Sequence, residues 1–448
     1  MTTTTTRAAR PPSFAGAGNL IYRSETVPVF TASEGCYLVD DSGRRYLDLE
    51  AANGTVPFGY DRSVLREALE RCAALPGLPS FCESSLRLTV LERLERLVSE
   101  RTGVAGRVEL DLGGAQAMET ALRIVAANRG PGTILVFEGA FHGRSAATSM
   151  LSSSPRYREF LAAIGLEVVR LPSPDCERCP HHQPTAGCSP GCVAAVANWG
   201  TEVSGVGGRQ HARRAVALIV EPVLNVAGMV EPDYALLHAA VRRAREHDAL
   251  VIVDEIFTGM HRTGPRWGFE RSGITPDIVV TGKGLSNGCA AVSMVWGREP
   301  LMSPDVYRPG SHSATYVGLP HALGVLDAVL DRWQAWDEVE SDIVVLERSL
   351  RTVLEQLRAA HTSTIAGIAV MGAAARIRLH GALAGRLRAL ARDHGPTGAL
   401  LAATGMAPDV INIHPPLIMG PDQFAEMRQV LDAALTALDD EQEARRQP

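Results

Sequence analysis

Polar and apolar positions along the chain change their period several times, and each period predicts a different element. Near residue 37, apolar residues alternate with polar ones on both sides of a DDSGRR turn, which indicates two short strands joined by a hairpin. From residue 107 an alternating segment, RVELDL, is followed by a Gly-Gly turn and by apolar residues at helical spacing between 118 and 125. This second pattern predicts a strand that leads directly into a helix.

Four later segments, TILVFEG, AVALIVEPV, ALVIVDEI and DIVVTG, are almost continuously apolar over the length of a strand. Strands of this composition are typical of parallel sheets that helices cover on both faces. After about residue 318 the chain changes to long amphipathic helices, two short predicted strands (IAGIAVMG and ARIRLHG) and a last helix from Pro421. We therefore expect an α/β wound sheet and a smaller C-terminal domain, since 448 residues exceed one ordinary core.

Polar residues stand at the ends of three of these apolar strands. Glu221 follows ALIV, Asp254 follows LVIV, and Lys283 lies just after DIVVTG. Ligands of wound sheets collect at the carboxyl ends of the strands, and a buried acid there needs a cation or a donor as partner. A helix cap or a structural salt bridge is the alternative for each acid taken alone. The Gly-Gly-Ala turn at 113–115, between a strand and a helix, is also suited to a phosphate.

Lys283 is the only lysine in the sequence, and the other 43 of the 44 basic residues are arginine. Either side chain can carry a solvated positive charge, so a genome rich in arginine can replace most lysines. An ε-amine differs because it can lose its proton and form a Schiff base with a carbonyl compound. The single lysine therefore indicates a chemical role, with compositional drift as the alternative.

Together these residues resemble the class III aminotransferases, which are fold-type I enzymes that use pyridoxal 5'-phosphate (PLP). The resemblance runs from about residue 25 to 435, and its most specific part is LVIVDEIFTGMHRTGPRWGFERSGITPDIVVTGKGLSNG. It implies a large domain with a wound, mostly parallel sheet and a smaller α+β domain built from N- and C-terminal segments. We expect a tail and joining segment at 1–60, the PLP-binding domain at 61–318 and the small domain at 319–448.

The resemblance also implies roles for individual residues. Lys283 would form the Schiff base with PLP and carry the proton of the substrate carbon, and Asp254 would hold the proton on the pyridine nitrogen. Phe141 and Ile256 match the residues on the two faces of the ring. Gly114 and Ala115 match the phosphate turn.

Thr315, in SHSATYVG, matches a threonine that reaches the phosphate from the neighbouring subunit, which implies a homodimer with the site at its interface.

Three positions depart from the family pattern and narrow the expected substrates. Phe257 replaces a glutamine that often contacts the ring oxygen of the cofactor. Asn412 replaces the arginine that binds an α-carboxylate, and Val226 replaces the glutamate that neutralises this arginine between half-reactions. Because both members of the pair are missing, no buried charge is left without a partner. We therefore expect a primary amine or amino acid as donor, and a carbonyl acceptor other than 2-oxoglutarate.

Four cysteines are clustered in the predicted loop 172–195. Cys176, Cys179, Cys188 and Cys192 form a Cys-x2-Cys pair and a Cys-x3-Cys pair, which could bind a structural zinc ion or an iron-sulfur cluster. Two histidines at 181–182 could substitute as ligands. Reduced thiols or a pair of disulfides remain the alternatives.

Composition limits the remaining classes of function. The net charge of −6 gives no reason to expect a nucleic-acid partner, and no apolar run reaches the length of a membrane span. The Thr- and Pro-rich N-terminus has no apolar core of a signal peptide, so we expect a cytoplasmic enzyme. An aminomutase, a racemase or epimerase, or a decarboxylase would use the same carbanion chemistry. A non-catalytic PLP-fold scaffold or metal sensor is a further alternative.

Overall fold

The large sheet of the protein has seven strands and is mostly parallel, as predicted. The computed structural model describes residues 28–75, 77–78, 82–158, 165–177, 190–197 and 214–446. In chain order the strands of this sheet are β4 (Gly106–Asp111), β5 (Thr133–Phe137), β6 (Val168–Leu171), β7 (Ala215–Val220), β8 (Leu250–Asp254), β9 (Ile278–Thr281) and β10 (Ser293–Arg298). Their spatial order is β4-β10-β9-β8-β7-β5-β6. Strand β10 is antiparallel to both β4 and β9, and all other neighbouring strands are parallel.

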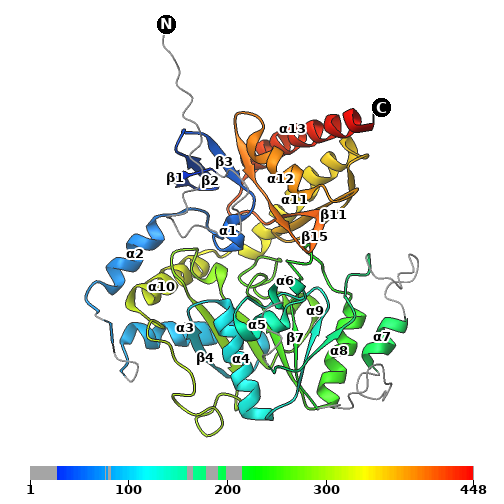
Figure 1. Ribbon diagram of the computed structural model, residues 1–448. Coiled ribbons are helices and arrows are strands. Elements are labelled where there is room, and N and C mark those ends of the chain that lie inside the picture. The colour runs from blue at the N-terminus through cyan, green and yellow to red at the C-terminus, as the bar shows by residue number, and fades with distance from the viewer. Residues whose placement is uncertain are drawn as a thin grey trace.

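Helices cover both faces of this sheet (Figure 1). The helices of this part are α2 (Ser63–Cys72), α3 (Ser85–Thr102), α4 (Gly114–Arg129), α5 (Ala146–Leu151), α6 (Pro155–Arg158), α7 (Pro190–Ala197), α8 (Tyr234–Glu246), α9 (Phe269–Ser272) and α10 (Pro320–Ala335). Alternate residues of β8 point to opposite faces: Val251 and Val253 belong to the core cluster on the side of α8, whereas Leu250 and Ile252 belong to the cluster on the side of α4. This two-sided burial explains why the strands are continuously apolar.

Local signals fix the ends of several helices. The Ser84 side chain accepts a hydrogen bond from the Arg87 N–H at the start of α3, and the helix ends at Gly103, which has a φ of 70°. The Asp233 side chain caps α8 in the same way through the Leu236 N–H. A polar N-cap satisfies an amide that has no partner within the helix, and a left-handed glycine ends the helix without steric strain.

The second part of the molecule combines segments from both ends of the described chain (upper half of Figure 1). Its first sheet has the order β1-β2-β3-β13, in which β13 pairs in parallel with β3, and its second sheet has the order β11-β12-β15-β14. Their bounds are β1 (Phe30–Glu34), β2 (Tyr37–Asp40), β3 (Arg45–Asp48), β11 (Ile365–Met371), β12 (Ala374–Leu379), β13 (Gly398–Leu400), β14 (Ala402–Thr404) and β15 (Ala407–Ile413).

Four helices complete this part, α1 (Ala51–Gly54), α11 (Val339–Ala360), α12 (Ala384–Asp393) and α13 (Pro421–Arg446). Helices α11, α12 and α13 pack on one another and against these sheets, which gives the predicted smaller α+β unit. Helix α10 instead packs against α2 and α3. The division of the chain at residues 60 and 318 stays a prediction.

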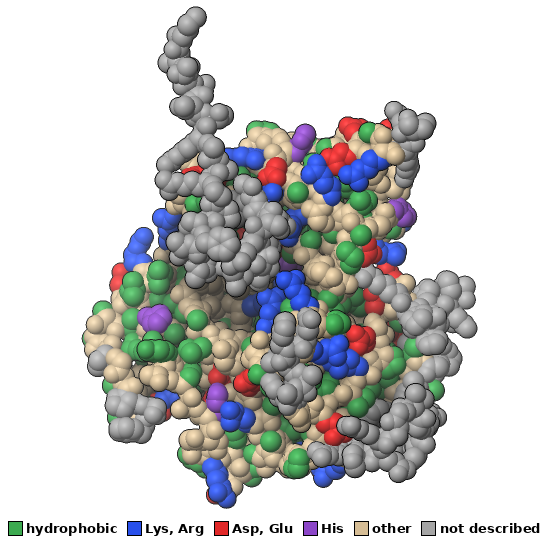
Figure 2. Space-filling view, in the orientation of Figure 1, with side chains coloured by type: hydrophobic (Ala, Val, Ile, Leu, Met, Phe, Trp, Pro, Cys, Tyr) green, Lys and Arg blue, Asp and Glu red, His purple; other side chains and the backbone are tan. Residues whose placement is uncertain are grey.

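Charged side chains of both signs are interspersed over the visible face of the described residues (Figure 2). This mixture agrees with the small net charge of −6. Among the described helices, none combines the length and the low polarity that crossing a bilayer requires.

Candidate active site

A cavity of about 470 Å³ lies at the carboxyl ends of β5, β7, β8 and β9. Ligands of wound sheets bind at such an edge. Most of the residues singled out in the sequence meet here. The predicted residues that line the cavity are Gly114, Ala115, Phe141, Glu221, Val226, Asp254, Ile256, Phe257 and Lys283. Residues 53, 142–144, 223 and 225 complete its wall.

Lys283 lies in a short 3-10 turn directly after β9, with a φ of 41°. Its Nζ atom is 5.1 Å from the centre of the Phe257 ring. Burial lowers the pKa of Lys283, while the negative charges of Asp254 and Glu221 oppose this effect. A lowered pKa increases the fraction of neutral amine, which is the form that attacks a carbonyl carbon.

Asp254 ends β8 and is paired with a histidine that the sequence did not single out. His142 Nδ1 lies 2.8 Å from Asp254 Oδ2, and Asp254 Oδ1 accepts a hydrogen bond from the Ile256 N–H. Burial lowers the pKa of His142, but the hydrogen bond and charge of Asp254 outweigh burial and raise the pKa overall. His142 Nε2 is buried and has no partner among the described residues. His142 therefore positions the Asp254 carboxylate through this hydrogen bond.

Glu221, at the end of β7, fixes the backbone of the predicted ring-stacking residue. Its Oε1 atom accepts a hydrogen bond of 2.8 Å from the Phe141 N–H. Burial raises the pKa of Glu221 to about 7, although the charge of His142 lowers it. Glu221 thus positions Phe141 and adds negative charge near Lys283.

Two close approaches of the backbone shape the predicted phosphate turn. A side chain at Gly114 would place its Cβ 2.9 Å from Ile256 Cδ1, and one at Gly143 would place it 2.8 Å from Ala115 Cβ. Gly143 also has a φ of 125°, which strongly favours glycine. The turn therefore brings the N-terminus of α4 against the cavity, where its N–H groups suit an anion.

These residues fit PLP. They provide a buried amine, a carboxylate hydrogen-bonded to a buried histidine, an aromatic ring beside an aliphatic residue, and helix N–H groups for a phosphate.

Part of the cavity wall carries neutral groups, and we call this part the substrate end. Val223, Asn225 and Val226 line it, and Asn412 lies behind Asn225 and donates hydrogen bonds to it. Arg144 borders the cavity with its guanidinium carbon 5.5 Å from the centre of the Phe141 ring.

Two groups of predicted residues lie elsewhere. Thr315 is exposed and does not line the cavity of its own chain. Cys179 and Cys188 lie outside the described residues, while Cys176 is half-buried and Cys192 is buried. Within the described ranges no cluster of three or more His, Cys, Asp or Glu side chains could hold a metal ion.

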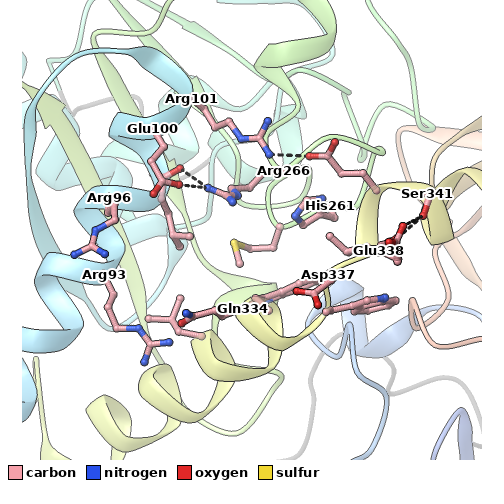
Figure 3. A pocket seen from close by; sticks show the side chains of 17 residues that line it. Arg93, Arg96, Glu100, Arg101, His261, Arg266, Gln334, Asp337, Glu338 and Ser341 are labelled. Atoms are coloured by element: carbon pink, nitrogen blue, oxygen red, sulfur yellow. Dashed lines mark hydrogen bonds and ion pairs between the residues drawn. The ribbon is translucent and has the colours of Figure 1, made fainter.

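A larger cavity of about 720 Å³, between α3, α10 and the start of α11, has a different character (Figure 3). Four arginines line it, and each has an acidic partner. Figure 3 shows Arg266 directed at Glu100, at 3.0 Å, and Arg101 pairs with Glu270 and Glu340. Arg93 pairs with two aspartates of α10 and Arg96 with Glu92. Because its cations are already neutralised, this cavity is a weaker candidate for chemistry than the one around Lys283.

Comparisons with known proteins identify the family of the chain. The family model of the class III aminotransferases matches residues 21–435. The chain is 28% identical to the ornithine aminotransferase of Emericella nidulans, covering 92% of this chain and 86% of that protein. It is 26% identical to a diaminobutyrate--2-oxoglutarate transaminase of Bordetella parapertussis, with 93% and 92% covered. The structure of an omega transaminase from Pseudomonas jessenii in complex with PMP has a TM-score of 0.80 at 21% identity, covering 92% of both chains. The chain belongs to the class III aminotransferases, a family of PLP-dependent enzymes.

Proposed function

We propose that the enzyme, with PLP bound in the cavity around Lys283, transfers an amino group from a primary amine to a carbonyl acceptor. The tail of the amine is uncharged, and the acceptor is not 2-oxoglutarate. One observation carries this proposal: the only lysine of the sequence lies in the same cavity as the His142–Asp254 pair and the N-terminus of α4. Such a set of perturbed titratable groups in one cavity is typical of active sites.

Bound PLP supplies an aldehyde that condenses with primary amines and a ring that accepts an electron pair from the substrate carbon. The residues of this chain then have separate tasks. Lys283 Nζ takes and returns a proton, which its lowered pKa favours. Asp254, hydrogen-bonded to His142, would supply a negative charge to the ring of the cofactor. Phe141 and Ile256 would hold this ring, and the N-terminus of α4 would hold the phosphate.

The substrate end of the cavity supports an acceptor that does not bury an α-carboxylate there. Val226 and Asn412 provide no cation there, and burying a carboxylate without one is unfavourable. One relative is named for its use of 2-oxoglutarate, but we expect this chain to differ at that point. Arg144 also lies on the cavity wall.

An absorbance spectrum of the purified protein, recorded before and after addition of primary amines, tests the function. We expect a cofactor band that amines discharge and that an added aldehyde or ketone restores, with the amino group appearing on the acceptor. An aminomutase, racemase or decarboxylase would change the donor without such transfer. A non-catalytic scaffold or metal sensor would show no change with amines.

The exposed position of Thr315, away from the cavity of its own chain, supports a homodimer in which Thr315 reaches the partner's phosphate site. Mixing Thr315→Ala with Lys283→Ala should then restore some active sites. Exchange of subunits without any recovery of activity would contradict a shared site.

The spacing of the four clustered cysteines supports a structural zinc ion or iron-sulfur cluster in the loop 172–195. Elemental analysis should find zinc or iron at about one atom or cluster per chain or per dimer. The variant Cys176→Ser/Cys188→Ser should lose the metal and unfold at a lower temperature. A metal-free preparation made without chelator would rule the site out.

A further inference from the structure

The turn that forms the substrate end of the cavity is held by side chains from three strands of the small sheet. The turn is closed by an isolated bridge between Leu224 and Val230, and the N–H groups of Gly228 and Met229 both donate to Asn225 O. Residues 223, 225 and 226 of this segment face the cavity. The conformation of the turn therefore sets the shape and polarity of that wall.

Three carbonyl oxygens of the turn each accept a hydrogen bond from a different strand. Asn412 of β15 donates to Asn225 O at 2.9 Å, and Thr404 of β14 donates to Val226 O at 2.7 Å. Arg376 of β12 donates to Gly228 O at 3.4 Å. Gly228 itself has a φ of 102°, and a Cβ there would lie 2.9 Å from Ala407 Cβ. The turn is thus fixed closely against β15.

The same contacts fix the orientation of the Asn225 amide. Asn412 Nδ2 also donates to Asn225 Oδ1, at 3.1 Å. Because Oδ1 is turned toward Asn412 Nδ2, the Nδ2 hydrogens of Asn225 lie on the other side of the amide. No described residue accepts a hydrogen bond from Asn225 Nδ2, and Asn225 is half-buried on the cavity wall. The substrate end of the cavity therefore presents a fixed, neutral donor.

We propose that Asn225 is a specificity-determining residue, whose amide donates a hydrogen bond to an uncharged oxygen in the tail of the substrate, a hydroxyl or carbonyl oxygen. This inference rests on the proposed function of the cavity. A second ammonium group has only donors, so it cannot accept the hydrogen bond that Asn225 Nδ2 offers. A carboxylate would gain one neutral donor between Val223 and Val226, which does not offset its desolvation.

Asn412 is the positioning residue in this arrangement, since it acts only through Asn225. Without it the Asn225 amide could turn and present its oxygen to the cavity instead.

Four amines with the same five-carbon chain test the proposal: pentylamine, 5-amino-1-pentanol, 5-aminopentanoate and 1,5-diaminopentane. The second-order rate constant at which each discharges the cofactor band of the holoenzyme needs no acceptor. A neutral hydrogen bond should make the amino alcohol about 3- to 10-fold better than pentylamine. The diamine and the amino acid should both be poorer than the amino alcohol.

The variants assign this preference to one amide. Asn225→Leu should bring the ratio of amino alcohol to pentylamine close to one. Asn225→Asp keeps the size of the side chain but replaces the donor by a negative charge, and it should shift the preference to the diamine. Asn412→Leu should lower the ratio, and Asn225→Leu should lower it no further in that background. Thr404→Val removes one bond to the turn without touching the amide and should retain the ratio.

Asn53, which also lines the cavity, provides the second control. Its φ of 62° suits glycine, so Asn53→Gly removes that amide without strain, and the ratio should persist. The assignment of Asn225 would be wrong, with the proposed function untouched, in two cases. In the first, the wild type reacts with pentylamine but shows a ratio of amino alcohol to pentylamine near one. In the second, this ratio is lost in Asn53→Gly but kept in both Asn225 variants. If none of the four amines reacts, both the assignment of Asn225 and the proposed function are contradicted.

Discussion

The two ends of the cavity hold their polar groups in opposite ways. At the cofactor end, ionisable groups are buried close together: the charge of Asp254 acts to raise the pKa of both His142 and Lys283. At the substrate end, Asn225 and Asn412 are neutral and bonded to each other, next to Val226. Buried charges can drive proton transfer, whereas neutral amides can only orient a ligand. The chemistry and the choice of substrate are therefore separated within one cavity.

The largest expected effect comes from removing the amine. Lys283→Ala should lower multiple-turnover activity by roughly 10⁴-fold or more, because proton transfer at Nζ is lost together with the covalent attachment of the cofactor. Lys283→Arg should be equally inactive, since guanidinium stays protonated. Steady-state rates with a reactive amine measure both variants, and near wild-type activity in either would contradict the role of the charged end.

Asp254→Asn should lower the rate by roughly 10²- to 10³-fold, because it removes a charge that acts on the transition state. The adjacent Glu255 provides a matched control. It is also fully buried, but it accepts hydrogen bonds from the Gly268 and Phe269 N–H groups and does not line the cavity.

Glu255→Gln should reduce stability with little change in rate. Equal losses of rate in the two variants would mean that Asp254 acts through the fold alone.

Two substitutions would introduce a pair of charged side chains at the neutral end of the cavity. The double variant Val226→Glu/Asn412→Arg should raise turnover of 2-oxoglutarate by about tenfold, since a cation would then meet the α-carboxylate. Either single change should do less, because it buries one unpaired charge. Efficient use of 2-oxoglutarate by the unmodified enzyme would instead point to Arg144, on the cavity wall, as the anchor of the carboxylate.

We expect the smallest effect on rate, within about tenfold, for His142→Gln. The difference in stability between this variant and the wild type should depend on pH. The pKa of His142 is raised in the folded chain above its ordinary value of 6.5. The stabilisation from its pair with Asp254 is then complete below pH 6.5 and is lost as the pH rises through the raised pKa. Melting temperatures of the wild type and His142→Gln should differ most near pH 6 and converge at alkaline pH. A constant difference would exclude a charged pair.

The residues of the charged end could be predicted from the sequence, because they belong to short local patterns. Lys283 and Asp254 each follow a continuously apolar strand, and the strands themselves were recognisable from burial on both faces. His142 was missed although it follows Phe141 directly. Its partner Asp254 lies 112 positions away, and no local pattern indicates such a pair.

The neutral end was only half predicted. The absence of charge at Val226 and Asn412 could be read from the sequence, but the role of Asn225 could not. Asn225 and Asn412 are 187 positions apart, and they meet only because the small sheet packs against the turn after β7. Strands β13 and β14 are three residues long and were likewise not predicted, since so short a segment has no measurable period.

Borohydride reduction of the holoenzyme, followed by digestion and mass spectrometry, tests the central claim most directly. The sequence contains one lysine, so a reduced cofactor has only Lys283 and the terminal amine as possible attachment points. We predict one phosphopyridoxyl group per chain, on the peptide that contains TGKGLSNG, and its loss when a reactive amine is added before reduction. A protein that carries no label there, or that keeps the label after treatment with every amine, would contradict the assignment of Lys283 as the reacting amine of this enzyme.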